Sequence, residues 1–393
     1  MQVYWDWTTL LIYIIMATGG VLCLNNRSKY TIVINKVHKI NLAYTLFFIV
    51  WVVFAAYRYI APNGIGGTDA YSYVDYFEKC IYAVSNSFSY RAEVGFRFFN
   101  QFLRHITDDY HIYLIIVYSV IVGSYIYFVK TFKNKYSSSA LYVVSLFYFV
   151  NSFCVLRSSL ASAILLIGIT FLYKKKYFGA IFFGIISIFI HSSLIFYLGF
   201  YVFWFLFKKK RLTVKICIMF AVLGFVIGKV FQTLVISGTL NIISGTPIDV
   251  YVGYSMSKRF FEDYWKIVIS QLLLVIVFVI YRRKLLSRVK LFDDESKEQF
   301  HFVYVACLYD LLLIPILSVL NVWRGIEYFF WPRLIMWGYI IKVIACQVSG
   351  KGRRIIYVGA VVCGYAYMIF RIYTQYDMGG LMPYIFAPFA RNI

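Results

Sequence analysis

The chain has 393 residues, of which 62% are hydrophobic, 21% aromatic and only 14% charged, and its mean hydropathy is +0.73. So little charge over such a length excludes a soluble globular protein and indicates a polytopic membrane protein. The net charge of +22 does not indicate a nucleic-acid partner, because the Lys and Arg residues cluster in short loops between apolar runs, where they set membrane topology.

Apolar runs bounded by charges predict about twelve membrane-spanning helices, in an all-α fold that forms one integral membrane domain over residues 1–393. Asp6 stands where a cleaved signal peptide would be basic, so we expect the first span to be retained. The predicted spans are 8–24, 40–57, 111–129, 140–156, 158–173, 177–190, 192–207, 213–236, 267–281, 301–320, 334–349 and 355–370.

The basic residues fall in alternate loops and therefore predict the orientation of the chain. These loops, which we assign to the cytoplasm, are 27–39, 130–135, 174–176, 208–215, 282–297 and 351–354. The other loops then face outward, as do both termini; the largest of them are 58–104, 237–266 and 321–333.

Residues 58–110 are predicted to form an external segment that contains two amphipathic helices. The first begins at a Thr68 N-cap, and Asp69 lies in its first turn on the apolar side. The Asp69 carboxylate either interacts with the helix dipole or projects into a protein cavity.

The second amphipathic helix is predicted to begin near Glu93 and to lie at a membrane interface or over the helix bundle, with its polar side facing a water-filled space. The alternative is a surface helix with a weak Glu93–Arg97 ion pair. Its polar stripe consists of Glu93, Arg97, Asn100, Gln101 and Arg104.

Two predicted hairpins are unusually short. Residues 177–207 must cross the membrane and return, which leaves each arm about 23 Å long at 1.5 Å per residue. His191 at the turn should therefore lie below the outer surface, and Arg157 is placed similarly by the preceding hairpin. We expect both to line the floor of an outward-facing cavity that the 58–104 segment covers.

Later in the chain, Asp310 and Lys342 lie about halfway along neighbouring antiparallel spans. They are predicted to neutralise each other as a structural pair, and a proton relay is the alternative.

The external loop NVWRGIEYFFWPR carries Arg324 and Arg333, either for function or as arginines that snorkel from an interfacial aromatic belt. The sequence has no metal-ligand spacing and no nucleotide-binding motif.

The order of several short motifs resembles the EpsG/Wzy-type polymerases of bacterial surface polysaccharide. The motifs are Arg58, GTDAYSY with Asp69 and Tyr73, EVGF with Glu93, LRSSLASA with Arg157 and IHSSLI with His191. The resemblance covers mainly residues 40–200. Ser158 follows Arg157 where many relatives have Gln, so no role is given to an amide there.

The resemblance implies a GT-C-like glycosyltransferase in the bacterial cytoplasmic (inner) membrane. Such an enzyme joins oligosaccharide repeat units, carried on undecaprenyl pyrophosphate, at the outer face of the membrane during synthesis of O-antigen, capsule or exopolysaccharide. No nucleotide sugar, metal or other cofactor is implied, because both substrates arrive on lipid carriers. Membrane lipid is an expected partner, and a separate protein that regulates chain length is left open.

This reaction predicts roles for the candidate residues. Arginines stabilise the leaving pyrophosphate, and a carboxylate or imidazole accepts the proton of the attacking hydroxyl. Glu93 is the first candidate for the base, and Asp69 and His191 are the second. Tyr73 and Trp323 are candidates for stacking on sugar, against the alternative of core or interfacial aromatics. The candidates for pyrophosphate are Arg157, Arg324 and Arg333, followed by Arg58 and Arg97.

Two alternatives remain open from the sequence. A flippase or transporter of lipid-linked oligosaccharide also has about twelve spans, and the Asp310 and Lys342 charges favour it. An O-antigen ligase shares external arginines with the polymerase and differs in its acceptor.

Overall fold

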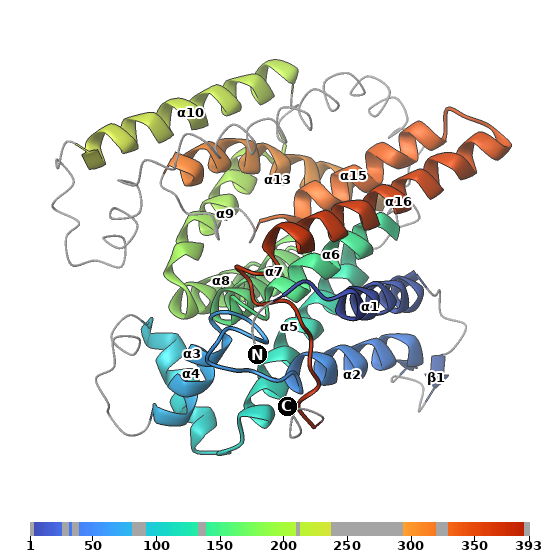
Figure 1. Ribbon diagram of the computed structural model, residues 1–393. Helices are drawn as coiled ribbons and strands as arrows, with labels where there is room; N and C mark the ends of the chain where they lie inside the picture. The colour runs from blue at the N-terminus through green and yellow to red at the C-terminus, as the bar shows by residue number, and fades with distance from the viewer. Residues whose placement is uncertain are drawn as a thin grey trace. The chain divides into compact units, whose positions relative to one another are not determined.

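The computed structural model describes residues 4–25, 31–33, 39–80, 92–132, 139–209, 213–236, 294–319 and 329–388. These residues are almost entirely helical (Figure 1), apart from a short antiparallel ribbon of β1 (Thr31–Val33) and β2 (Lys39–Asn41) in which Thr31 lies opposite Asn41. The helices are α1 (Trp7–Asn25), α2 (Leu42–Ala56), α3 (Ala70–Lys79), α4 (Val94–Arg104), α5 (Tyr110–Phe132), α6 (Ser139–Asn151), α7 (Leu156–Tyr173), α8 (Tyr177–Ile190), the 3-10 turn η1 (Ser192–Leu194), α9 (Ile195–Phe207), α10 (Val214–Ile236), α13 (Asp294–Val319), α15 (Trp331–Ala345) and α16 (Gly350–Gln375).

A helix occupies the position of each predicted span within the described residues, whereas the predicted span 267–281 lies outside them. Among the described residues, four helices are both long and apolar enough to cross a membrane: Trp7–Leu24, Tyr110–Phe132, Leu156–Tyr173 and Gly350–Gln375. Shorter apolar helices cover Leu42–Ala56, Tyr177–Ile190 and Ser192–Phe207. The short helices include both arms of the predicted 177–207 hairpin.

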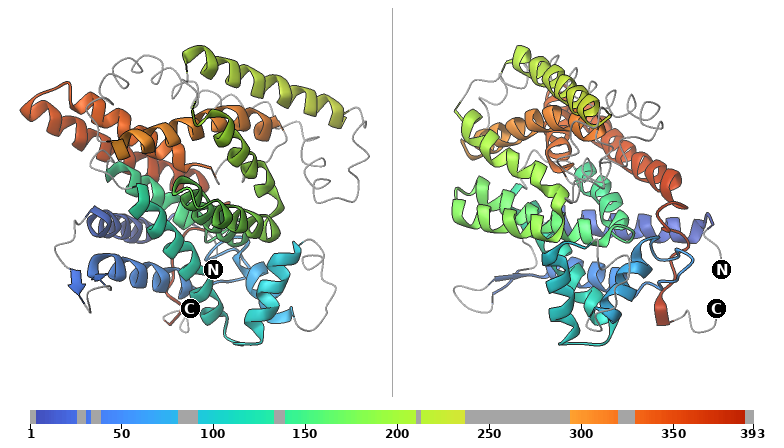
Figure 2. Two further views of the ribbon diagram at one scale, coloured as in Figure 1. Left: turned by 180° about the vertical axis from the view of Figure 1, so that it is seen from behind. Right: turned by 90° about the vertical axis from the view of Figure 1, so that its left-hand side faces the viewer.

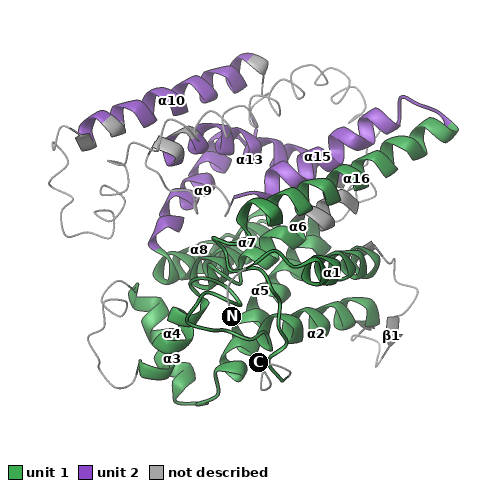
Figure 3. Cartoon of the chain, in the orientation of Figure 1, with its two compact units in different colours: residues 1–191, 350–393 green, residues 192–349 purple. Residues whose placement is uncertain are grey.

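The chain divides into two compact units (Figure 3). Unit 1 contains residues 1–191 and 350–393, so it is assembled from both ends of the sequence. Unit 2 contains residues 192–349. The candidate residues of segment 58–110, together with Arg157 and His191, all belong to unit 1.

Within unit 1, the helices pack mainly against neighbours in the sequence. Helix α7 packs against α5 and α8, α2 against α5, and α1 against α2, which runs beside it (Figures 1 and 2). The last helix, α16, returns to pack against α6. The amphipathic helices α3 and α4 contact each other, and they also reach α7 and α8 respectively.

Arg58 lies in the interior of unit 1 with only 1% of its surface exposed. Its Nε donates to the Gly66 carbonyl at 2.7 Å and Nη2 to the Phe153 carbonyl at 3.3 Å, while Nη1 donates to the carbonyl of Ala55 at the end of α2. Its guanidinium also lies 4.5 Å from the centroid of the Phe153 ring. Arg58 therefore joins the end of α2, the following loop and the turn between α6 and α7.

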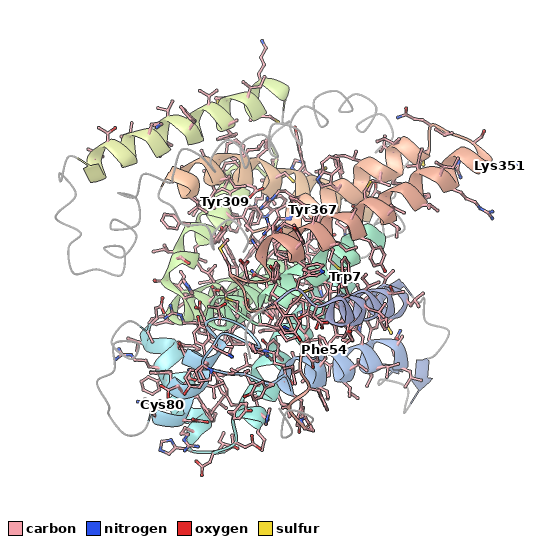
Figure 4. The ribbon with its side chains drawn as sticks, viewed as in Figure 1. Trp7, Phe54, Cys80, Tyr309, Lys351 and Tyr367 are labelled. Atoms are coloured by element: carbon pink, nitrogen blue, oxygen red, sulfur yellow. The ribbon has the colours of Figure 1, made fainter. Side chains whose placement is uncertain are left out.

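The C-terminal segment 378–387 crosses the same region of unit 1. The Tyr59 N–H donates to the Ile385 carbonyl and the Ala387 N–H to the Tyr57 carbonyl, both at 2.7 Å. Near the other end of the segment, the Thr68 hydroxyl donates to the Met378 carbonyl at 2.6 Å. Tyr384 stacks on Phe54, which is labelled in Figure 4. These contacts attach the end of the chain to the loop that leads into α3.

Unit 2 is organised around α13, which packs against α9, α10 and α15. Gly224 allows α10 to approach α13 closely, because a Cβ atom at this position would lie 2.3 Å from the Leu312 carbonyl oxygen. The aromatic rings of Phe200, Phe329 and Trp331 contact one another in the interior of this unit.

Replacing Arg58 with Met should lower the free energy of unfolding by about 3 kcal/mol or more, because three buried carbonyls would lose a charged donor. Thermal unfolding of the detergent-solubilised protein measures this loss. The control is Arg354→Met, since Arg354 is exposed on α16. Equal unfolding midpoints for the two variants would contradict the structural role of Arg58.

Candidate functional site

Helix α4 begins beside the end of α8 because a glycine permits close contact. Glu93 is the N-cap residue of α4, and Gly95 follows it in the first turn. A Cβ atom at Gly95 would lie 2.7 Å from both the Cβ and the carbonyl oxygen of Phe189, which is closer than real side chains come. The absence of a side chain at Gly95 thus lets α4 pack directly on the last turn of α8.

His191 is the C-cap residue of α8, and its backbone is extended. Its backbone N–H donates to the Ser187 carbonyl at 2.9 Å, which completes the last turn of the helix and directs the chain away. The imidazole is 7% exposed and faces α4. The end of α8 therefore places a titratable ring beside the start of α4.

Glu93 lies between two basic side chains. Its Oε2 accepts a hydrogen bond from Arg157 Nη1 at 2.7 Å, and its Oε1 lies 3.9 Å from His191 Nδ1. The side chains of Glu93 and Arg157 are 15% and 16% exposed. We call Glu93, Arg157 and His191 the Glu93 cluster; its members come from α4, the first turn of α7 and the end of α8.

Aromatic side chains surround the cluster on the α3 side. The Arg157 guanidinium lies 5.9 Å from the centroid of Phe96, and the Phe96 ring in turn contacts Tyr73 and Tyr76. Burial raises the pKa of the Tyr76 hydroxyl, and the positive charges of Arg97 and Arg157 oppose this shift. Tyr76 is thus within electrostatic reach of both arginines.

The sequence profile of the EpsG family matches residues 41–386, a range that includes the whole cluster. The chain belongs to the EpsG family. No curated protein and no solved structure matches it. Membership of the EpsG family, together with the apolar helices, indicates a membrane-embedded, glycosyltransferase-like polysaccharide polymerase that acts in the synthesis of surface polysaccharide.

In this EpsG-family protein, Glu93 pairs with Arg157 instead of forming the i, i+4 pair with Arg97 that the sequence left open. Arg97 is exposed on α4, one turn after Glu93. It therefore remains a candidate for binding an anion beside the cluster.

Arg58 is not available to a ligand in the same way, because its guanidinium donates to backbone carbonyls in the interior. Arg58 is therefore not part of the candidate site.

The start of α3 differs from the prediction by one residue. The N-cap is Asp69 and not Thr68, whose hydroxyl is directed at the C-terminal segment. The Asp69 side chain is partly exposed and makes no capping hydrogen bond.

Tyr73 is 3% exposed and packs edge-on against Phe96, so it supports the cluster from behind and does not present a free ring face to a sugar.

The predicted polar stripe of α4 is interrupted. Asn100 is buried together with Phe96 and Leu103, and its amide donates to the Phe96 carbonyl at 2.7 Å. The side of α4 that carries Phe98 and Phe102 is exposed instead. A helical period identifies the faces of a helix, but only packing decides which face is covered.

Sequence reasoning did not identify Gly95 and Phe96 as parts of the site. Both lie in the EVGF motif directly after Glu93. A glycine in the first turn of a helix was the available signal, because glycine weakens a helix and often marks a place where another backbone approaches closely.

The pairing predicted for Asp310 is wrong. Within unit 2, Asp310 is 2% exposed and forms an ion pair with Arg333 Nε at 2.9 Å. Arg333 lies in the first turn of α15, and Lys342 lies about 13 Å further along the same helix at 1.5 Å per residue. The first turn of α15, and not its middle, therefore meets Asp310.

Two predicted site residues, Trp323 and Arg324, lie outside the described residues. Within the described ranges, no group of three or more His, Cys, Asp or Glu side chains is arranged to hold a metal ion.

Replacing Gly95 with Ala should shorten or abolish the polymer, because the added methyl group would move α4 away from Phe189 and separate Glu93 from His191. Gel analysis of surface glycan from a complemented deletion strain measures polymer length. The matched control is Gly123→Ala in α5, whose Cβ would make only an ordinary 3.7 Å contact. Normal polymer in Gly95→Ala cells would show that the close approach is dispensable.

For unit 2, a double-mutant cycle on Asp310 and Arg333 should give a coupling free energy of at least about 1 kcal/mol. The same cycle on Asp310 and Lys342 should give none. Thermal unfolding of Asp310→Asn, Arg333→Met, Lys342→Met and the two double variants supplies the data. Coupling confined to Asp310 and Lys342 would support the pairing expected from the sequence instead.

Proposed function

We propose that this EpsG-family protein polymerises oligosaccharide repeat units carried on undecaprenyl pyrophosphate at the outer face of the bacterial cytoplasmic membrane. The observation that supports this proposal best is the Glu93 cluster, which joins a guanidinium, a carboxylate and an imidazole in one partly exposed place. Glycosyl transfer from a lipid diphosphate requires these types of group.

Arg157 is proposed to bind the leaving pyrophosphate. Glu93 contacts Arg157 through Nη1, and this contact orients the guanidinium plane while the side chain keeps some exposure. A planar guanidinium binds phosphate oxygens through two parallel hydrogen bonds and stabilises the charge that develops as the bond breaks. Arg97, exposed one turn after Glu93, is the proposed second cation.

Glu93 is proposed as the base, with His191 as the alternative. The two Glu93 oxygens lie toward different partners, since Oε2 is bonded to Arg157 and Oε1 is near His191 Nδ1. A proton received by Glu93 on Oε1 would leave the contact with Arg157 in place. If His191 is the base instead, Glu93 would stabilise the imidazolium that forms.

The acceptor sugar hydroxyl attacks the anomeric carbon of the donor glycan, and a new carbon–oxygen bond forms. The bond between that carbon and the phosphate oxygen breaks, so undecaprenyl pyrophosphate leaves with the electron pair beside Arg157. The hydroxyl proton passes to Glu93 or His191.

The membrane arrangement that we propose has about twelve spans and an outward-facing cavity of GT-C type, with the α3–α4 segment on the external side. Asp69 is kept as a further candidate base, and Trp323, Arg324 and Arg333 as candidate substrate ligands. Both substrates arrive on lipid carriers, and neither a nucleotide sugar nor a metal is part of the proposed step.

The ligase alternative differs from polymerisation only in the acceptor and would use the same groups. The flippase alternative has less support from the structure than from the sequence, because Asp310 forms an ion pair with Arg333 at the start of α15. Deletion of the gene distinguishes the polymerase from these two alternatives. Loss of long chains with single repeat units still on the cell surface identifies a polymerase, whereas loss of every unit identifies a flippase or a ligase.

Arg157→Lys should strongly reduce polymerisation while membrane abundance stays normal, because an ammonium cannot form the bidentate contact. Glu93→Gln should do the same, since an amide cannot accept the proton. Gel analysis of surface glycan and immunoblotting of membranes measure polymer and abundance. The control is Lys351→Arg, because Lys351 is exposed at the start of α16. Polymer of normal length in Arg157→Lys cells would remove Arg157 from the mechanism.

A further inference from the structure

One side of α4 exposes large apolar residues. Phe98 is 72% exposed and Phe102 64%, and Val94 is also exposed. These three residues recur every fourth residue, which places them on one face of α4. Ile106, just beyond the end of the helix, is exposed as well. The opposite face, with Phe96 and Leu103, is buried. An apolar face of this kind in contact with water would be unfavourable.

The exposed face of α4 is continuous with an exposed face of α8. Helix α8 buries its small residues Ala180, Gly184 and Ser187, and it exposes large apolar residues along the other side. Those exposed residues are Phe178, Ile181, Phe182, Ile185 and Phe189. Phe189 is the residue on which Gly95 packs, so the exposed residues of α8 end where those of α4 begin.

The length of α8 leaves room for α4 within the bilayer. With 14 residues, α8 is roughly 21 Å long, whereas the hydrocarbon core of a bilayer is about 30 Å thick. A helix packed on the end of α8 adds about 10 Å, which is the diameter of a helix with its side chains. Together the two helices match the thickness of the hydrocarbon core.

The charges on α4 are compatible with this position. At 100° per residue, Arg104 lies on the side opposite Phe102, and it pairs with Asp108 at 2.5 Å. Arg97 is exposed beside Phe98, and its long side chain can extend toward the headgroups while its methylene groups stay in the apolar layer. The polar face of α3, with its Lys79–Asp75 ion pair, is the neighbouring polar surface.

We propose that α4 lies within the outer leaflet, where Phe98 and Phe102 contact the acyl chains of bilayer lipids and α4 completes the hydrophobic thickness of the short α8. The Glu93 cluster then lies below the membrane surface. That α4 lies in the membrane rests on membership of a membrane-protein family, and the choice of the outer leaflet rests on the orientation proposed above. Its consequence, that a lipid-linked sugar reaches Arg157 sideways from the bilayer, rests on the proposed function.

Photocrosslinking tests the position of α4 directly. A diazirine analogue of phenylalanine is introduced at position 98 or 102 of the full chain, and the protein is reconstituted in phosphatidylethanolamine and phosphatidylglycerol vesicles and illuminated. Mass spectrometry then identifies the adducts. Phe182, 51% exposed on α8, is the lipid-facing control, and Glu78, exposed on α3, is the water-facing control.

Phospholipid adducts at 98 and 102 should equal those at 182 and exceed those at 78 roughly tenfold, as expected for a helix in the acyl layer. Water adducts at the level of position 78 would overturn the proposal. Crosslinks to a second copy of the chain or to another protein would also overturn it. Because no catalytic residue is changed, the result does not depend on whether the chain is a polymerase.

Discussion

The contact of one carboxylate with two basic side chains is the interaction on which the candidate site depends. Glu93, Arg157 and His191 are distant in sequence, and each is mostly buried. A buried charge is costly unless it is paired, so the Glu93 carboxylate and the Arg157 guanidinium each lower the cost of burying the other. The close approach of Gly95 to Phe189 brings the carboxylate to this place. The ion pairing in the cluster therefore depends on the packing of α4 on α8.

Two arginines of unit 1 illustrate how surroundings separate a structural from a functional role. Arg58 directs its guanidinium at three backbone carbonyls and is fully buried, so no edge is left for a ligand. Arg157 is bonded by a side-chain carboxylate and keeps partial exposure. The first holds the end of α2, the loop before α3 and the turn before α7 together. The second begins α7 directly after that turn, so the structural arginine helps to position the proposed functional one.

In the proposed membrane arrangement, the short α8 places the site deeper than a full-length span would. A helix of 14 residues would end inside the hydrocarbon layer, and its C-terminal carbonyls and His191 would then need cover from lipid. Helix α4 supplies this cover in the proposed arrangement, with its apolar side toward lipid and Glu93 toward the basic groups. A lipid-linked substrate fits this arrangement, because its hydrocarbon chain can contact the apolar side of α4 while its diphosphate reaches the basic groups of the Glu93 cluster.

Apolar runs and charged loops are local features of the sequence, so the helices could be predicted from them. Helices occupy the predicted positions within the described residues, and Glu93 is the N-cap of α4 as expected. The partners of the charged side chains, in contrast, depend on how the helices pack in three dimensions. Glu93 pairs with Arg157 and not with Arg97, and Asp310 pairs with Arg333 and not with Lys342. Asn100 is buried although it belongs to the predicted polar stripe of α4. Hydropathy and periodicity identify which residues can be buried or charged, but a pairing needs two helices in contact, and that contact depends on packing details such as the missing side chain of Gly95.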